Sequence, residues 1–110
     1  MNRITIANAL KVLDGLDNNE EPYIEPFKHG SMRIGFYKPQ GTDPQEPHTQ
    51  DELYIIASGN GYFVTSTTRQ KCETGEVLFI AAHQEHRFED FSEDFAAWVV
   101  FYGAEGGEKA

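Results

Sequence analysis

The chain has 110 residues, of which 18 are acidic and 9 are Lys or Arg, and its formal net charge is −9 at pH 7. This length fits one domain that buries roughly 65% of the surface of its unfolded chain and folds without disulfides. The negative charge argues against nucleic-acid partners and anionic membranes, because both are bound through Lys and Arg, and favours a small molecule, a metal ion or a second copy of the chain.

Cysteine usage and the apolar segments indicate the compartment. Cys72 is the only cysteine, so the chain cannot form an internal disulfide, which favours a reducing cytoplasm. Residues 1–6 lack the apolar segment of a signal peptide, and no apolar run approaches the ~20 residues of a membrane span. We expect a soluble, cytoplasmic protein.

The first predicted element is a short helix over about residues 6–16. Ile6, Leu10 and Leu13 share one helical side, and they follow Thr5, a candidate N-cap. The helix is expected to precede the core of the domain and to pack through this apolar side.

The next segments predict strands. Residues 23–27 read as extended chain that Pro26 places at a sheet edge, because proline lacks the N–H that a central strand donates. Residues 32–37 alternate in hydropathy, and we expect the face that carries Met32 and Phe36 to be the buried one. On the other face, Arg33 is read as part of a surface salt bridge, with a contact to an anionic ligand as the alternative.

The remaining segments also predict strands. Residues 53–57 are apolar on both faces, which is typical of a strand covered on both sides. Gly59-Asn60-Gly61 predicts a tight hairpin into a returning strand over residues 62–67. Further strands are expected over residues 68–74, 77–81, 86–91 and 95–102. Short strands separated by turns at intervals of roughly 8–12 residues indicate an all-β barrel or sandwich with its core over about residues 23–102, followed by a flexible tail over 103–110.

Potential metal ligands gather where one predicted strand begins. Glu46, His48 and Glu52 occupy positions two and four apart, which point to one side in extended backbone. His86 opens a later strand, so the four side chains meet if the two strands are neighbours. Imidazole with carboxylate suits one divalent ion, with Fe, Mn or Zn preferred and Ni or Co as alternatives. Gln50 would point to the same side in extended backbone and is the substitute candidate ligand for Glu46, although an amide is a poorer metal ligand than a carboxylate.

Two segments resemble the two motifs of the cupin superfamily, in its small single-domain form. Residues 41–59 resemble the first motif, which is a glycine, five residues, His-x-His, three or four residues, Glu, six residues and Gly. Residues 75–90 resemble the second motif, which is a glycine, five residues, Pro-x-Gly, two residues, His, three residues and Asn. The residues in register are His48, Glu52, Gly59, Gly75 and His86.

The chain departs from both motifs. Glu46 stands where the family has its first histidine, and only four residues separate it from Gly41. In the second motif Ala81 replaces proline, His83 replaces glycine and Asp90 replaces asparagine. The resemblance still implies a jelly-roll barrel of antiparallel strands, in which three of the usual four metal ligands are present and ligation by Glu46 is open.

The resemblance leaves the activity open, because cupins include oxygenases, isomerases, other enzymes and regulators. The leading expectation is a metal beside a pocket for a small organic molecule, with oxygenase or isomerase chemistry if the protein is an enzyme, in a homodimer. The alternatives are a non-catalytic binding or sensing module and a structural dimer with a decayed site. No catalytic residue is assigned. Candidate pocket residues, chosen by parity or as core aromatics that could face the metal, are Met32, Phe36, Tyr54, Phe88 and Trp98.

Overall fold

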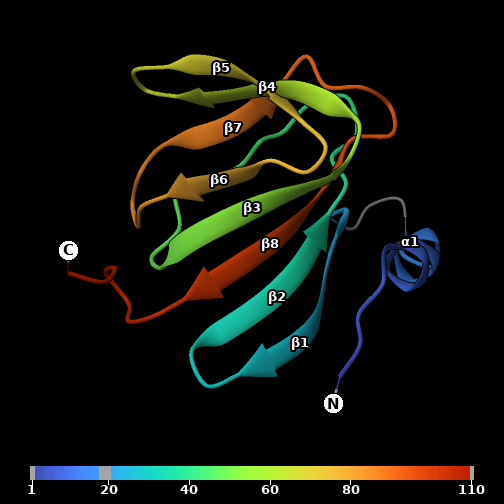
Figure 1. Cartoon of the computed structure of the whole chain (residues 1–110), viewed down its shortest axis with the longest axis horizontal. Helices are drawn as coiled ribbons and strands as arrows, with labels where there is room; N and C mark the ends of the chain where they lie inside the picture. Colours follow the sequence, from blue (N-terminus) through green and yellow to red (C-terminus); the bar gives the residue numbers. More distant parts are fainter. Residues whose placement is uncertain (1, 18–20, 110) are drawn as a thin grey trace.

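The computed structural model describes residues 2–17 and 21–109. One helix precedes the strands of the barrel, and the bounds are α1 (Ile6–Asp14), β1 (Tyr23–His29), β2 (Met32–Tyr37), β3 (Asp51–Ser58), β4 (Asn60–Thr65), β5 (Arg69–Glu73), β6 (Val77–Ile80), β7 (His86–Glu89) and β8 (Ala96–Tyr102). They form a five-stranded sheet in the order β1-β2-β8-β3-β6 and a three-stranded sheet in the order β5-β4-β7, both antiparallel (Figure 1). The predicted all-β, jelly-roll-like architecture with one short helix is confirmed.

The main core lies between the two sheets. Tyr54 and Ile56 of β3 point into it, and Phe63 of β4 and Phe88 of β7 pack against them from the smaller sheet. The alternate residues of β3 are half-buried on its other face. The two-sided apolar pattern of β3 therefore reflects a strand with covered surface on both sides.

The predicted hairpin at Gly59 is wrong in one respect. The chain does turn there, with Gly59 at a φ of 74°, but β3 and β4 do not pair with each other and belong to different sheets. A side chain at this position would collide with Ser92 and with the backbone of Phe95. Gly59 thus carries the chain from one sheet to the other, through a space that only glycine fits.

The edge position of β1 is confirmed. Within the described residues, β1 pairs only with β2, and the register shifts between Ile24 and Phe27, on either side of Pro26. Proline is tolerated here because the irregularity removes the need for its missing N–H.

Helix α1 covers part of the outer face of the five-stranded sheet. Its N-terminus is capped by the Thr5 hydroxyl, which accepts from the Asn8 N–H at 3.1 Å, and the helix ends at Asp14, two residues before the predicted end. A small second core forms under it, in which Ala9, Leu10 and Leu13 pack on a set from the sheet: Ile24, Phe36, Ala57, Ala96 and Trp98.

The described part of the C-terminal segment is held by hydrogen bonds, which differs from the expected flexible tail. The Gly106 N–H donates to the Thr49 carbonyl at 2.6 Å, and the Glu108 N–H donates to Asp51 Oδ2 at 2.8 Å. The Glu108 N–H, together with the Ala82 N–H that donates to Asp51 Oδ1, lowers the pKa of Asp51. Among the described residues, no helix is long and apolar enough to cross a membrane.

Candidate metal centre

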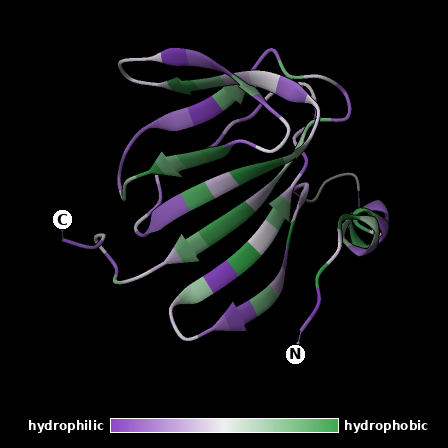
Figure 2. Cartoon of the chain, viewed as in Figure 1, coloured by the Kyte–Doolittle hydropathy of each residue, from purple (hydrophilic) through white to green (hydrophobic). Residues whose placement is uncertain are grey.

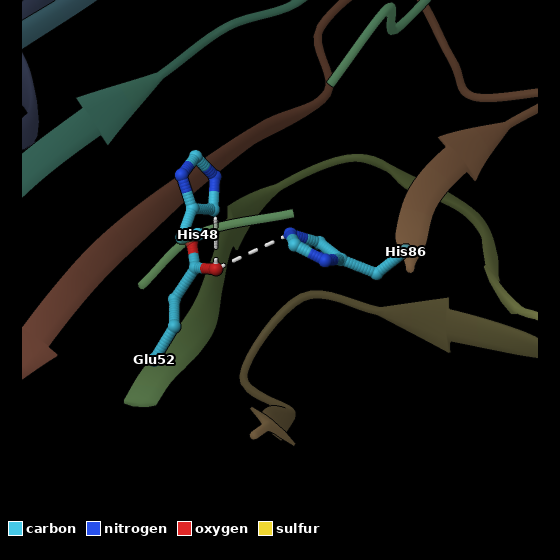
Figure 3. A group of neighbouring side chains, drawn as sticks. All are labelled: His48, Glu52 and His86. Atoms are coloured by element: carbon cyan, nitrogen blue, oxygen red, sulfur yellow. Dashed lines mark ion pairs between the residues drawn. The ribbon is translucent and has the colours of Figure 1, made fainter. Parts of the chain in front are cut away.

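Three side chains from separate segments converge at one end of the barrel. His48 lies in the loop before β3, Glu52 is the second residue of β3, and His86 is the first residue of β7. One ligand atom from each lies within 4.8 Å of the other two (Figure 3). His86 Nε2 is 3.2 Å from Glu52 Oε1, and His48 Nε2 is 4.0 Å from the same oxygen.

Backbone contacts hold the two loops that supply and flank the histidines. The His83 N–H donates to the His48 carbonyl at 2.7 Å, and the Ala82 N–H donates to Asp51 Oδ1 at 2.9 Å. His83 and Asp90 have positive φ angles of 66° and 48°. They occupy positions where the motif has glycine and asparagine, which adopt this backbone more readily than most residues, so the local conformation is one the motif residues also favour.

The buried residue Asp43 fixes the approach to this loop. It accepts hydrogen bonds from the Tyr37 hydroxyl at 2.6 Å, the Gln45 amide at 2.6 Å and the Phe88 N–H at 2.8 Å. A carboxylate that accepts several hydrogen bonds can stay buried at modest cost. Asp43 was not predicted from the sequence, because it sits in a proline-rich loop without periodicity.

Two polar atoms of the centre are buried without a hydrogen-bond partner. In the part of the chain that the structure describes, these are Glu52 Oε1 and His86 Nε2, in side chains that are each only 1% exposed. The other ring nitrogen, His86 Nδ1, lies 2.8 Å from the Gln84 carbonyl, so it carries a hydrogen and leaves a lone pair on Nε2 in the neutral ring. Two lone pairs then face each other, an arrangement that a cation or a proton satisfies.

The electrostatics differ for the two histidines. Burial lowers the pKa of His86, but the nearby Glu52 carboxylate and the Gln84 carbonyl outweigh it, and the pKa is raised overall. Burial lowers the pKa of His48, which Glu52 only partly offsets. His48 is thus disposed to be neutral, and at His86 a metal ion would compete with a proton.

The other predicted ligands do not join the group. Glu46 is exposed, lines the mouth of a cavity and is not among the clustered ligand atoms. Gln50 is buried with all its polar atoms used, since its oxygen accepts from Arg33 at 2.9 Å and its amide donates to the Ser31 and Gly103 carbonyls. Residues 43–48 form no strand, so the extended parity that grouped these side chains does not apply before β3.

A cavity of about 430 Å³ opens beside His48 and Glu52. Of the candidate pocket residues, Tyr54 packs against His86 and Phe88 packs against Tyr54 in the core, and neither lines this cavity. Phe36 and Trp98 lie under α1, on the opposite face of the sheet, and Met32 shares the parity of Phe36. The prediction that the Met32–Phe36 face of β2 lines the barrel interior is therefore wrong. This face packs under α1, and the sequence pattern of β2 does not distinguish an apolar surface under a helix from one inside the barrel.

The opposite face of β2, which carries Arg33 and Tyr37, forms the cavity wall together with residues of other strands. Arg33, Tyr37, Tyr23 and Phe101 line it. Arg33 does form the predicted salt bridge, with Glu25 at 3.1 Å, and its guanidinium also lies 4.4 Å from the Phe101 ring centroid. The sequence did not predict Tyr23 and Tyr37 as pocket residues. The alternation along β2 would have indicated Tyr37 if the opposite face of this strand had been assigned to the barrel interior.

Comparisons with known proteins identify the family. The family model described as a cupin domain matches residues 34–102. An uncharacterized protein from Streptomyces coelicolor is 32% identical over 85 residues, which cover 76% of this chain and 81% of that protein. The HTH-type transcriptional activator RhaR from Pectobacterium atrosepticum is 29% identical over 79 residues, which cover 72% of this chain and only 28% of the activator.

The solved structures agree in fold. A cupin-2 domain containing protein from Shewanella frigidimarina superposes with a TM-score of 0.70 at 15% identity, covering 88% of this chain and 91% of that chain. With a family match that extends over more than half of its length and both cupin motifs meeting at His48, Glu52 and His86, the chain belongs to the cupin domain family.

Proposed function

We propose that this cupin binds one divalent metal ion through His48, Glu52 and His86 and presents it to a small organic molecule in the adjoining cavity. The observation that carries the proposal is that Glu52 Oε1 and His86 Nε2 are buried and have no hydrogen-bond partner among the described residues. Two imidazoles with one carboxylate suit Fe(II), Mn(II) or Zn(II) and leave coordination positions open.

The three proposed ligand residues differ in side-chain exposure. Glu52 and His86 are buried and fixed, whereas the His48 side chain is 37% exposed and borders the cavity. A bound metal would act there as a Lewis acid or, if iron, in O₂ chemistry. The aromatic wall around Phe101 would exclude water from one side of the ligand. We propose oxygenase or isomerase chemistry on this basis.

The second candidate function is non-catalytic sensing, which the relationship to the transcriptional activator favours. A sensor would bind its ligand in the same cavity without turnover. Product analysis of metal-loaded protein with candidate ligands separates the two functions, since a sensor returns the ligand unchanged.

The test of the metal centre is elemental analysis after reconstitution with Fe(II), Mn(II) or Zn(II) and desalting. We expect about one ion per chain in the wild type and loss of most of the metal in His48→Ala and His86→Ala, because two ligands rarely retain a transition ion. Glu46→Gln is the matched control and should retain the wild-type content. A wild type that holds no metal under any of these conditions would refute the proposal.

We also propose that the outer face of the five-stranded sheet binds a second copy of the chain. Two cross-strand rows of uncharged side chains run over β6, β3, β8 and β2, namely Phe79-Leu53-Val100-Ile34 and Val77-Ile55-Trp98-Phe36. In Figure 2, hydrophobic residues recur along these four strands. Helix α1 covers one end of them, but Val77 and Phe79 remain 60% and 55% exposed. In a chain with a net charge of −9, a second copy brings the same uncharged face, so a twofold pairing of sheets buries it without charge repulsion at the contact.

Light scattering during size-exclusion chromatography tests this pairing. We expect a mass near twice 12.4 kDa for the wild type and the monomer mass for a Val77→Lys, Phe79→Lys double variant. Val12→Lys, at a 54% exposed position of α1, is the control and should leave the mass unchanged. A monomeric wild type at tens of micromolar would contradict the proposal.

We propose that the protein works in a reducing compartment such as the cytoplasm. Cys72 is buried, and burial raises the pKa of its thiol to about 11, so it stays protonated and unreactive. Neither a nucleic acid nor a membrane is proposed as a partner, for the reason of charge given above.

A further inference from the structure

The cavity beside the metal centre changes in character along β2. Arg33, Gly35 and Tyr37 alternate onto the cavity side of this strand, and the ring of Tyr23 from β1 occupies the space that a side chain on Gly35 would fill. The order along the wall is therefore Arg33, Tyr23, Tyr37, and the backbone positions of the first and last are about 13 Å apart. A ligand that spans this wall therefore meets a guanidinium at one end and phenol rings at the other.

The Arg33 end is suited to a carboxylate. Its guanidinium donates to Glu25 at 3.1 Å and to Gln50 at 2.9 Å, which fixes the plane and leaves further N–H donors free for a ligand. Glu25 also lies 3.6 Å from Lys28, so it does not fully neutralise Arg33. Of the described residues that line the cavity, Arg33 is the only Lys or Arg.

Arg33 also adjoins the metal centre. The Phe101 ring centroid lies 4.4 Å from Arg33 Cζ and 4.9 Å from the His48 ring centroid, so Arg33 and the candidate metal centre share one aromatic wall. A carboxylate placed there would have Arg33 on one side and the metal position on the other. Charge-assisted bonds of this kind are among the stronger polar contacts.

The tyrosine end is suited to a cation. Tyr23 and Tyr37 pack edge to face at 6.4 Å, and each hydroxyl donates away to a carboxylate, Tyr23 to Glu25 and Tyr37 to Asp43. Burial and these carboxylates raise the pKa of both phenols, so both stay protonated as donors. The electron-rich rings attract cations.

Two exposed carboxylates, Glu21 and Glu46, also line the cavity. Aromatic rings together with carboxylates are the arrangement that recognises alkylated ammonium groups. The wall is therefore cationic at Arg33 and electron-rich at the tyrosines.

We propose that the cavity binds a small zwitterion, with its carboxylate at Arg33 beside the metal centre and its alkylated ammonium end against the partly exposed ring of Tyr23, which packs on the buried Tyr37. This rests on the proposed function in that the metal centre forms the inner wall of the site. A zwitterion carries no net charge, so the acidic surface of the chain does not repel it, as it would a simple anion.

Isothermal titration with three matched probes tests the proposal. The first is 4-(trimethylammonio)butanoate; the second is 5,5-dimethylhexanoate, which has the same shape without the positive charge; the third is butyltrimethylammonium, which lacks the carboxylate. For the wild type we expect the zwitterion to bind most tightly, the neutral-headed acid about fivefold more weakly and the cation more than about tenfold more weakly.

Two variants separate the ends. Arg33→Gln should weaken binding of both carboxylates about tenfold and leave the cation unchanged. Tyr23→Leu should abolish the preference for the zwitterion over the neutral-headed acid. Equal binding of those two probes by the wild type, or no effect of Arg33→Gln, would overturn the proposal.

Metal content measured on the same samples distinguishes the two proposals. Both variants should hold as much metal as the wild type, because neither residue is a ligand. The titrations are repeated in EDTA, where the Arg33 and Tyr23 effects should persist. Failure of the metal centre then appears as absent metal with intact probe selectivity, whereas failure of the zwitterion site appears as intact metal without selectivity.

Discussion

Glu52→Gln is expected to make the metal-free protein more stable and to abolish its stabilisation by metal. The Glu52 side chain is 1% exposed and its Oε1 has no hydrogen-bond partner among the described residues, so without metal this buried acceptor lacks a donor whenever the His86 ring is neutral. A glutamine removes the charge and supplies an N–H that can donate to His86 Nε2. We expect urea unfolding to show a gain of about 1–3 kcal/mol for the variant.

The same pair of proteins behaves in the opposite way with metal present. At a free metal concentration 100 times the Kd, the wild type should gain about 2.7 kcal/mol, whereas the variant should gain almost nothing. Glu46→Gln makes the same chemical change at the exposed rim and should alter neither quantity. If Glu52→Gln destabilises the metal-free protein, the carboxylate is serving as a structural acceptor, and the argument for an open metal centre fails.

The sequence predicted the parts of the centre that depend on regular backbone. Glu52 is the second residue of β3 and His86 the first residue of β7, and short-range alternation together with the motif spacing was enough to pair them. Glu46 and Gln50 were grouped with them by the same alternation, which fails in a loop where side-chain direction is set by tertiary contacts. Gln50 shows this most directly, because its amide is used to hold Arg33 and the Gly103 carbonyl.

The face of β2 could not be predicted from its own residues. Both parities of this strand meet apolar or aromatic surface, one under α1 and one in the barrel, so hydropathy alone cannot tell which is inside. Phe36 is buried as expected and Trp98 is partly buried, but both lie under the helix and not in the barrel interior. Similarly, the turn at Gly59 was found, while its role in changing sheets depends on the non-local pairing of β3 with β8.

Replacing the two histidines separately should change the pH dependence of the metal-free protein in opposite directions. The pKa of His86 is raised above its ordinary value near 6.5, so its interaction with Glu52 stabilises the fold below that pH and is lost as the pH rises through the folded-state pKa. In urea unfolding with EDTA, His86→Gln should therefore cost more stability at pH 6 than at pH 8.5.

For His48 we expect the opposite pH dependence of stability. Its pKa is lowered, so its neutral form is favoured by folding, and the stability that this provides above pH 6.5 is lost as the pH falls toward the folded-state pKa. His48→Gln should accordingly gain stability relative to the wild type on acidification, by a smaller amount because this side chain is 37% exposed. Stabilisation of the wild type by metal should also diminish over the same interval, since protons compete for both rings. Parallel pH profiles for the two variants would show that the histidines share one electrostatic environment, which is incompatible with one fixed, buried ligand and one ligand open to the cavity.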